Sequence, residues 1–191
     1  MTKASQTRRA LIEKTALRLF ADRGYAEVSV RDISQACGIG ESALYRHMTS
    51  KEELAIRVFR EAYLRFGSRM LEAAQGTGPL KAKLSAYLRV MLEGFDEDAV
   101  LMRFLLISQH ETLAKAISSE DITPVLIIHD ALSIAASAGE VDLPDVDMAT
   151  ALVMGAALQP MTFMLYGRLP SPAISHHPAI LEGLTRLLGL N

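Results

Sequence analysis

Residues 29–51, with the sequence SVRDISQACGIGESALYRHMTSK, constrain the fold more than any other part of the chain. Ser29 and Asp32 form an S-x-x-D pattern, which is typical of the capped start of a helix. Gly38 supplies the backbone freedom to end that helix and turn sharply. A second helix is predicted over residues 41–48, after the turn, with Leu44 and Met48 facing inward. Two short helices joined in this way predict a helix-turn-helix, whose second helix enters the major groove of DNA.

Five short residue patterns occur in order in and around this stretch. They are Gly24-Tyr25, Ser29-Val30-x-Asp32-Ile33, Cys37-Gly38-Ile39, Leu44-Tyr45-x-His47 and Ser50-Lys51-Glu52-x-Leu54. Together they resemble the amino-terminal DNA-binding domain of the tetracycline-repressor (TetR) family of transcriptional regulators, over roughly residues 7–58. The resemblance implies an all-α fold. An N-terminal three-helix helix-turn-helix domain would be joined by a long helix to a C-terminal helical domain for ligand binding and dimerisation.

The composition independently favours a helical protein. Half of the residues are hydrophobic and only 6% are aromatic, so alanine, leucine and methionine supply most of the apolar side chains. No run of alternating β-branched residues bounded by turns predicts a strand. The single cysteine excludes an internal disulfide framework, and the first ten residues lack the apolar core of a secretory signal. A cytoplasmic protein is therefore expected.

The charge is unevenly distributed along the chain. Residues 1–70 contain 13 Lys and Arg against 8 Asp and Glu, whereas residues 71–191 contain 7 against 14. The net charge is only −2, but the amino-terminal part is positive and the remainder is negative. This asymmetry is expected when one end of a protein meets phosphates, although solvated helix faces can also produce it.

The resemblance and the side-chain chemistry indicate which residues contact DNA. The candidates are Ser29, Arg31, Glu41, Ser42, Ala43, Tyr45, Arg46, His47 and Lys51. The resemblance implies that the middle of the second helix reads bases, while Tyr45, His47 and Lys51 hold phosphates. Phenol, imidazole and ammonium groups can all donate to a phosphate. Arg46 could pair with both acceptors of a guanine.

Two residues depart from the family's usual pattern or suggest another role. Glu41 stands where relatives often have a neutral or basic residue. It could accept a hydrogen bond from a cytosine amino group, or it could be a surface charge that suits the helix dipole. Both interpretations remain open. Cys37 is expected to be a buried, inert thiol rather than a redox sensor.

Further helices are predicted along the rest of the chain. The predicted ranges are 7–23, a long helix from 50 toward 74, then 80–95, 97–109, 122–138, 145–167 and 178–188. Ser50 and Glu53 predict a second capping box at the start of the long helix. Residues 75–79, with two glycines and a proline, are the clearest break. The predicted parts are a DNA-binding domain over residues 1–50, a connecting helix over 51–75, and a ligand-binding and dimerisation domain over 76–191.

The carboxyl-terminal part holds the candidate effector site. By resemblance, a small molecule would lie among its central helices and two copies would pair through the last two. Apolar side chains and one histidine could line a cavity for an apolar or aromatic compound: Met91, Phe95, Met102, Leu105, Ile128, His129, Met154 and Phe163. The alternative is that these residues form an ordinary core, with His129 as a satisfied core histidine.

Residues 148–167 contain no charge, and twenty residues are enough to cross a membrane. Thr150, Gln159 and Pro160 interrupt this run, so a helix covered on several sides is expected instead, with Pro160 kinking it. No catalytic constellation or cofactor motif is recognisable, so no enzyme activity and no cofactor are expected. The histidine-containing pairs His110-Glu111, His129-Asp130 and His176-His177 do not make a metal site by spacing alone.

The sequence thus predicts a transcriptional regulator that binds DNA as a homodimer. Its expected partners are double-stranded DNA with a palindromic operator, a second copy of the chain and a small-molecule effector, with no membrane. Two alternatives remain: an architectural DNA-binding protein without an effector, and a helical small-molecule-binding protein or enzyme with a non-functional DNA motif.

Overall fold

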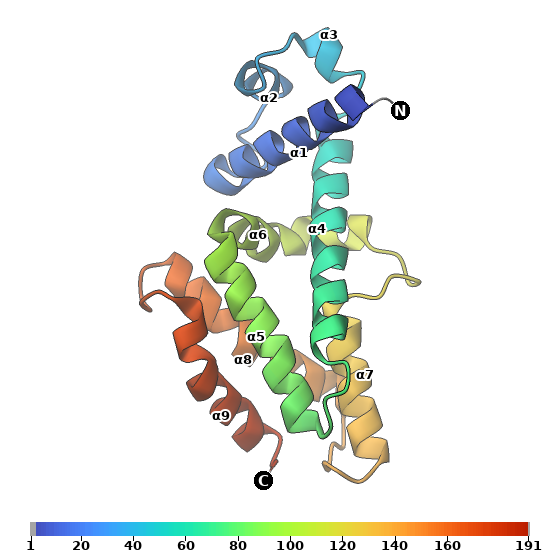
Figure 1. Ribbon diagram of the computed structural model, residues 1–191, viewed down its shortest axis with the longest axis vertical. Helices are drawn as coiled ribbons and strands as arrows, with labels where there is room; N and C mark the ends of the chain where they lie inside the picture. Colours follow the sequence, from blue (N-terminus) through green and yellow to red (C-terminus); the bar gives the residue numbers. More distant parts are fainter. Residues whose placement is uncertain (1–2, 191) are drawn as a thin grey trace. The chain divides into compact units, whose positions relative to one another are not determined.

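The structure, a computed structural model, describes residues 3–190, without the side chains of residues 3–5 and 108–114. All regular elements in this range are helical (Figure 1). They are α1 Lys3–Arg23, α2 Val30–Ala36, α3 Glu41–Leu44, α4 Lys51–Ala73, α5 Leu80–Glu97, α6 Ala99–Ala116, α7 Pro124–Ser137, α8 Val146–Leu165, the 3-10 helix η1 Ala173–His176, and α9 His177–Leu187. The all-α prediction is confirmed.

The chain divides into two compact units. One unit runs to Ala62 and includes Val100–Glu120, and the other contains Tyr63–Ala99 and the residues from Asp121 onward. Helix α4 contributes residues to both units. Most of α6 packs with the amino-terminal residues, whereas α5 and the helices from α7 onward belong to the second unit. The division into a DNA-binding domain, a connecting helix and a ligand-binding domain stays a prediction.

Aromatic packing explains why α6 belongs to the amino-terminal unit. The Phe104 ring of α6 lies 6.2 Å from Phe20 of α1 and 6.1 Å from Phe59 of α4, centroid to centroid. All three side chains are buried. Polar contacts continue this attachment, because Arg60 donates to the Ala116 carbonyl at 2.8 Å. At the same end of α6, the Lys115 ammonium lowers the pKa of the Glu52 carboxyl.

Helix α5 is the central element of the carboxyl-terminal unit, since it packs against α7, α8, η1 and α9 (Figure 1). Its side chains also fix the neighbouring segments. The Asp96 carboxylate accepts from the backbone N–H of Ala173 at 2.7 Å and of Ile174 at 3.0 Å. The buried His177 places Nε2 3.0 Å from the Ser85 carbonyl. These contacts attach η1 and the start of α9 to α5.

Helix α8 is less covered than expected. The twenty-residue helix is long and apolar enough to cross a membrane by length and composition alone. Within the single chain, only 33% of its most apolar 18-residue segment is buried. Large apolar side chains therefore remain exposed at Met148, Leu152 and Phe163. The expectation of a helix covered on several sides is not met by one chain.

Several predicted helix boundaries are wrong. Helix α1 begins at Lys3 rather than at residue 7, and α6 continues to Ala116 rather than ending at residue 109, since neither added segment contains glycine or proline. Helix α3 ends at Leu44 instead of continuing to residue 48. There, the His47 N–H bonds to the Leu44 carbonyl at 2.8 Å, which is a tighter i to i−3 bond.

Replacing Gly67 by alanine is expected to destabilise the carboxyl-terminal unit by about 1–3 kcal/mol. A Cβ atom at Gly67 would lie 2.9 Å from the Ile122 carbonyl oxygen, so helix α4 or the segment before α7 must shift. The neighbouring Ser68→Ala is the control because Ser68 is exposed. Urea unfolding followed by circular dichroism measures both variants, and equal midpoints would contradict the close approach.

Candidate nucleic-acid interface

Helix α2 begins at the predicted cap. The Asp32 N–H donates to Ser29 Oγ at 3.1 Å, and the Ser29 N–H donates to Asp32 Oδ2 at 2.8 Å, so the capping box is confirmed. The Ser29 hydroxyl also donates to the Asp32 carboxylate. This hydrogen bond, followed by the one from the Ser29 backbone, lowers the pKa of Asp32. The Ser29 side chain is thus engaged in its own helix start.

The turn between α2 and α3 has the predicted geometry. Gly38 adopts a φ of 65°, which is in the left-handed region that favours glycine. The Ile39 N–H then bonds to the Ser34 carbonyl at 3.0 Å and closes the end of α2. Cys37 is the C-terminal cap residue and is half-buried rather than buried as expected.

Helix α3 presents two different faces. Leu44 is fully buried and Met48 is 3% exposed, which confirms the predicted inward anchors. The predicted DNA-facing residues divide by exposure: Glu41, Ser42, Tyr45 and Arg46 are exposed, and Ala43 and His47 are half-buried. The exposed Arg31 lies on α2, the preceding helix. This face carries a guanidinium, a phenol, a hydroxyl and a carboxylate, which can all hydrogen-bond to DNA.

Lys51 has an intramolecular role that the sequence did not indicate. Its ammonium donates to the Tyr25 carbonyl at 2.9 Å and lies 4.2 Å from the centroid of the Tyr25 ring. The start of α4 is thereby attached to the segment that connects α1 and α2. An ammonium has three N–H donors, so Lys51 can keep the Tyr25 contact and still donate to a phosphate. The phosphate contact of Lys51 stays a prediction.

Arg57 of α4 was not among the predicted site residues. Its Nη2 donates to the His47 carbonyl at 3.1 Å, just after α3, and its Nε donates to Glu13 of α1 at 3.0 Å. Its Nη1 contacts Glu53 one turn earlier on α4. The Glu13 partner is 44 positions away in the sequence, so local periodicity could not reveal it.

The second predicted capping box, at the start of α4, is only half formed. The Glu53 N–H donates to Ser50 Oγ at 3.0 Å, as expected. The Glu53 carboxylate, however, accepts from the Thr49 N–H at 3.3 Å instead of the Ser50 N–H. Helix α4 therefore begins directly after the turn that follows α3, and the two elements are joined by backbone and side-chain hydrogen bonds.

Replacing Ser29 by alanine is expected to destabilise the amino-terminal unit by about 1 kcal/mol at neutral pH, because it removes the α2 cap. Asp32 adds a pH dependence. Its folded-state pKa lies below the ordinary 3.8, so its stabilising contribution exists above that value and is lost as the pH falls through the folded-state pKa. The difference in unfolding free energy between wild type and Ser29→Ala should therefore become smaller in acid.

The unfolding midpoints of wild type, Ser29→Ala and the control Ser42→Ala are measured from neutral pH into acid. A difference in stability between wild type and Ser29→Ala that stays constant with pH would contradict this dependence.

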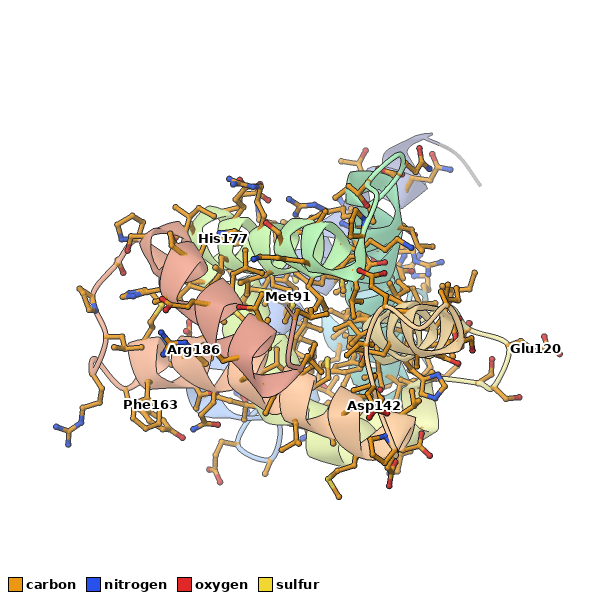
Figure 2. The ribbon with its side chains drawn as sticks, turned by 90° about the horizontal axis from the view of Figure 1, so that it is seen from below. Met91, Glu120, Asp142, Phe163, His177 and Arg186 are labelled. Atoms are coloured by element: carbon orange, nitrogen blue, oxygen red, sulfur yellow. The ribbon has the colours of Figure 1, made fainter. Side chains whose placement is uncertain are left out.

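The candidate effector residues do not gather in one unit. Met91, Phe95 and Ile128 are buried in the carboxyl-terminal unit, and Met154 there is half-buried. Met102 and Leu105 are buried in the amino-terminal unit. Phe163 is 44% exposed and points away from the helices, whereas Met91 lies among them (Figure 2). Their assignment to an effector site stays a prediction.

His129 is not a core histidine. Its ring is half-buried, with Nδ1 3.4 Å from Asp130 of the same helix and Nε2 3.4 Å from Asp147 of α8. His176 instead places Nε2 2.8 Å from the Pro170 carbonyl. Among the side chains that the structure describes, no three His, Cys, Asp or Glu residues are placed to hold a metal ion. The pair His110-Glu111 lies outside these described side chains.

Comparison with known proteins identifies the amino-terminal unit. Residues 12–58 match the sequence profile of the bacterial regulatory proteins, tetR family. This range covers most of α1, the whole of α2 and α3, and the start of α4. The match shows a tetR-type DNA-binding domain over these residues. The chain is therefore a DNA-binding transcriptional regulator.

Solved structures show the same fold over nearly the whole chain. The fatty acid degradation regulator FadR from Bacillus halodurans superimposes with a TM-score of 0.80 at 18% identity, covering 93% of this chain and 94% of that one. FadR from Bacillus subtilis, in complex with stearoyl-CoA, gives 0.76 at 21% identity, covering 92% and 96%. A TetR family regulator from Marinobacter aquaeolei VT8 gives 0.78 at 18% identity, covering 98% of both chains. The carboxyl-terminal helices thus share the fold of these regulators.

Proposed function

We propose that this protein is a ligand-responsive repressor that binds a palindromic operator as a homodimer in the cytoplasm. The two-faced α3 is the observation that carries this proposal. Its buried Leu44 and Met48 hold the helix against the domain, while Tyr45 and Arg46 remain exposed. A helix held in this way can place its outward side chains against base edges and phosphates.

The exposed apolar side chains of α8 and α9 support the homodimer. The two helices pack against each other. Their exposed large apolar residues, together with the residue that ends α8, are Met148, Leu152, Phe163, Tyr166 and Leu187. A second copy could cover this surface through a two-fold axis, which also suits a palindromic DNA site. Gly155 on α8 has open space where a Cβ would lie, so a partner helix could approach there.

Selection of duplexes from a random pool, at two salt concentrations, tests the DNA-binding proposal. The purified protein is expected to enrich a palindrome whose half-sites are about one helical turn, ~34–36 Å, or more apart. The affinity should fall as the salt concentration rises because phosphate contacts release counterions. No enrichment at either concentration would contradict operator recognition and would favour a small-molecule-binding protein with a non-functional DNA motif.

The effector is proposed to be a compound with a long apolar part, and a long-chain acyl-CoA is the first candidate to test. FadR from Bacillus subtilis was solved with stearoyl-CoA, and this chain shares that fold. Buried Met91, Phe95 and Ile128 give the carboxyl-terminal unit an adaptable apolar interior. An acyl chain requires such surroundings, whereas a polar effector would need several buried polar partners.

The proposed response follows from unequal effector affinity for two states of the protein. An effector can release the operator only if it binds the DNA-free state more tightly than the DNA-bound state. Helix α4 contributes to both units and is the proposed connection. Stearoyl-CoA binding is measured with and without operator DNA, and about a 5–150-fold difference is expected. Equal affinities would contradict regulation by this effector.

A further inference from the structure

Helix α3 is too short to fix its own orientation. It contains four residues, Glu41–Leu44, and the turn after it is closed by the bond from the His47 N–H to the Leu44 carbonyl. A helix of this length has no independent stability in water, so tertiary contacts must hold it. The buried Leu44 and Met48 set its depth in the domain. Apolar contacts are not directional, however, and leave its rotation poorly defined.

The Arg57 guanidinium supplies a directional contact at the end of this element. Each of its three nitrogens has a different partner: Nε contacts Glu13, Nη1 contacts Glu53, and Nη2 donates to the His47 carbonyl at 3.1 Å. A guanidinium is planar and rigid, so two fixed partners determine where the third nitrogen points. The carboxylates of α1 and α4 thus aim Nη2 at the backbone that follows α3.

The surroundings strengthen this arrangement. The Arg57 and Glu13 side chains are 19% and 17% exposed, so water and salt screen their interaction less than that of a surface pair. Glu13 also accepts from Arg9 Nε at 2.8 Å, which holds the carboxylate between two guanidinium groups. This hydrogen bond raises the pKa of Arg9. Arg57 is therefore oriented by partners that are themselves held in place.

We infer that Arg57 is a positioning residue for DNA recognition: it fixes the rotation of α3 relative to α1 and α4 without needing to touch DNA itself. Base readout requires side chains held to within about 0.5 Å and 10–20° of their productive geometry. Non-specific binding depends mainly on phosphate charge and tolerates much larger displacements. Loss of the Arg57 contact should therefore reduce discrimination between operator and non-operator DNA rather than affinity for DNA in general.

Arg57→Lys tests this inference, with Arg65→Lys as the matched control. Both variants keep the positive charge, and the control makes the same change at an exposed position of the same helix. Lysine has a single nitrogen and cannot join three partners in a plane. Arg57→Lys is expected to lower the ratio of operator to non-operator affinity about tenfold, which is the size of one lost base contact. The salt slope, which is the change of log affinity with log salt concentration, should not change. Arg65→Lys should change neither.

Two results would overturn the inference. An unchanged affinity ratio in Arg57→Lys would show that the His47 contact does not influence reading. Equal losses of operator and non-operator affinity, with the salt slope smaller by about one, would show that Arg57 is itself a phosphate contact. A double-mutant cycle with Glu13→Gln adds a check. If the effects of Arg57→Lys and Glu13→Gln on the affinity ratio simply add, the Glu13–Arg57 pair is not the positioning unit.

A measurement without DNA separates this inference from the proposed function, on which its DNA readout rests. Amide hydrogen exchange of residues 45–48 is expected to accelerate in Arg57→Lys, while the amides of α2 exchange as in the wild type. Glu13→Gln, a second variant, should accelerate the same amides by a smaller factor. Unchanged exchange in both would overturn the positioning role even if an operator is found. Localised acceleration supports it even if no operator is recovered.

Discussion

Replacing Phe104 by alanine is expected to destabilise the amino-terminal unit by about 3–5 kcal/mol. Phe104 is 2% exposed, and its ring lies against the buried rings of Phe20 and Phe59. Alanine would leave a cavity between helices α1, α4 and α6, because three helices cannot all close around it. Urea unfolding followed by circular dichroism, without DNA, measures the loss.

Tyr45→Ala is the control for this loss. Tyr45 is an aromatic side chain of the same unit but is 51% exposed, so its removal should change stability by no more than about 0.5 kcal/mol. It should instead weaken DNA binding, because its phenol is proposed to contact a phosphate. If Phe104→Ala unfolds at the same urea concentration as the wild type, α6 is not an integral part of the amino-terminal unit.

The double variant Leu152→Glu with Phe163→Glu is expected to be monomeric and to bind the operator about 100-fold or more weakly than the wild type. Two carboxylates without partners would be buried where α8 meets the second copy, and each costs several kcal/mol. A monomer contacts one half-site, so it loses the contribution of the other. Light scattering gives the mass in solution, and operator titration gives the affinity.

The folded single chain should survive these substitutions because the two side chains are 48% and 44% exposed in it. Ile134→Glu provides the matched control, since Ile134 is 61% exposed in the same unit but lies on α7. That variant should remain a dimer and keep its operator affinity. A double variant that still has the mass of a dimer would contradict pairing through α8 and α9.

Local signals in the sequence predicted the recognition element well. The Ser29 cap, the Gly38 turn and the inward Leu44 each depend on a few neighbouring residues, and each is present in the structure. The family patterns were informative for the same reason. They describe short segments whose conformation is determined by capping, glycine geometry and helical spacing.

Features that depend on distant residues were missed. The Arg57 contacts with Glu13 and His47, and the Lys51 contact with Tyr25, join segments that only the fold brings together. The packing of Phe104 against α1 and α4 likewise could not be inferred from periodicity, which shows that a face is buried but not what covers it. The same limit applies to α8, whose apolar sequence predicted a helix covered on several sides but not what covers it.

Titration of a duplex with both selected half-sites, and of a duplex with one half-site scrambled, tests whether the protein reads a palindrome as a dimer. Two protomers are expected to bind the intact duplex. Scrambling one half-site is expected to lower the affinity by at least about 100-fold, since several base contacts of about 1–3 kcal/mol each are lost. Equal affinity for the two duplexes, over a range of salt concentrations, would contradict a dimeric protein that reads a palindromic operator.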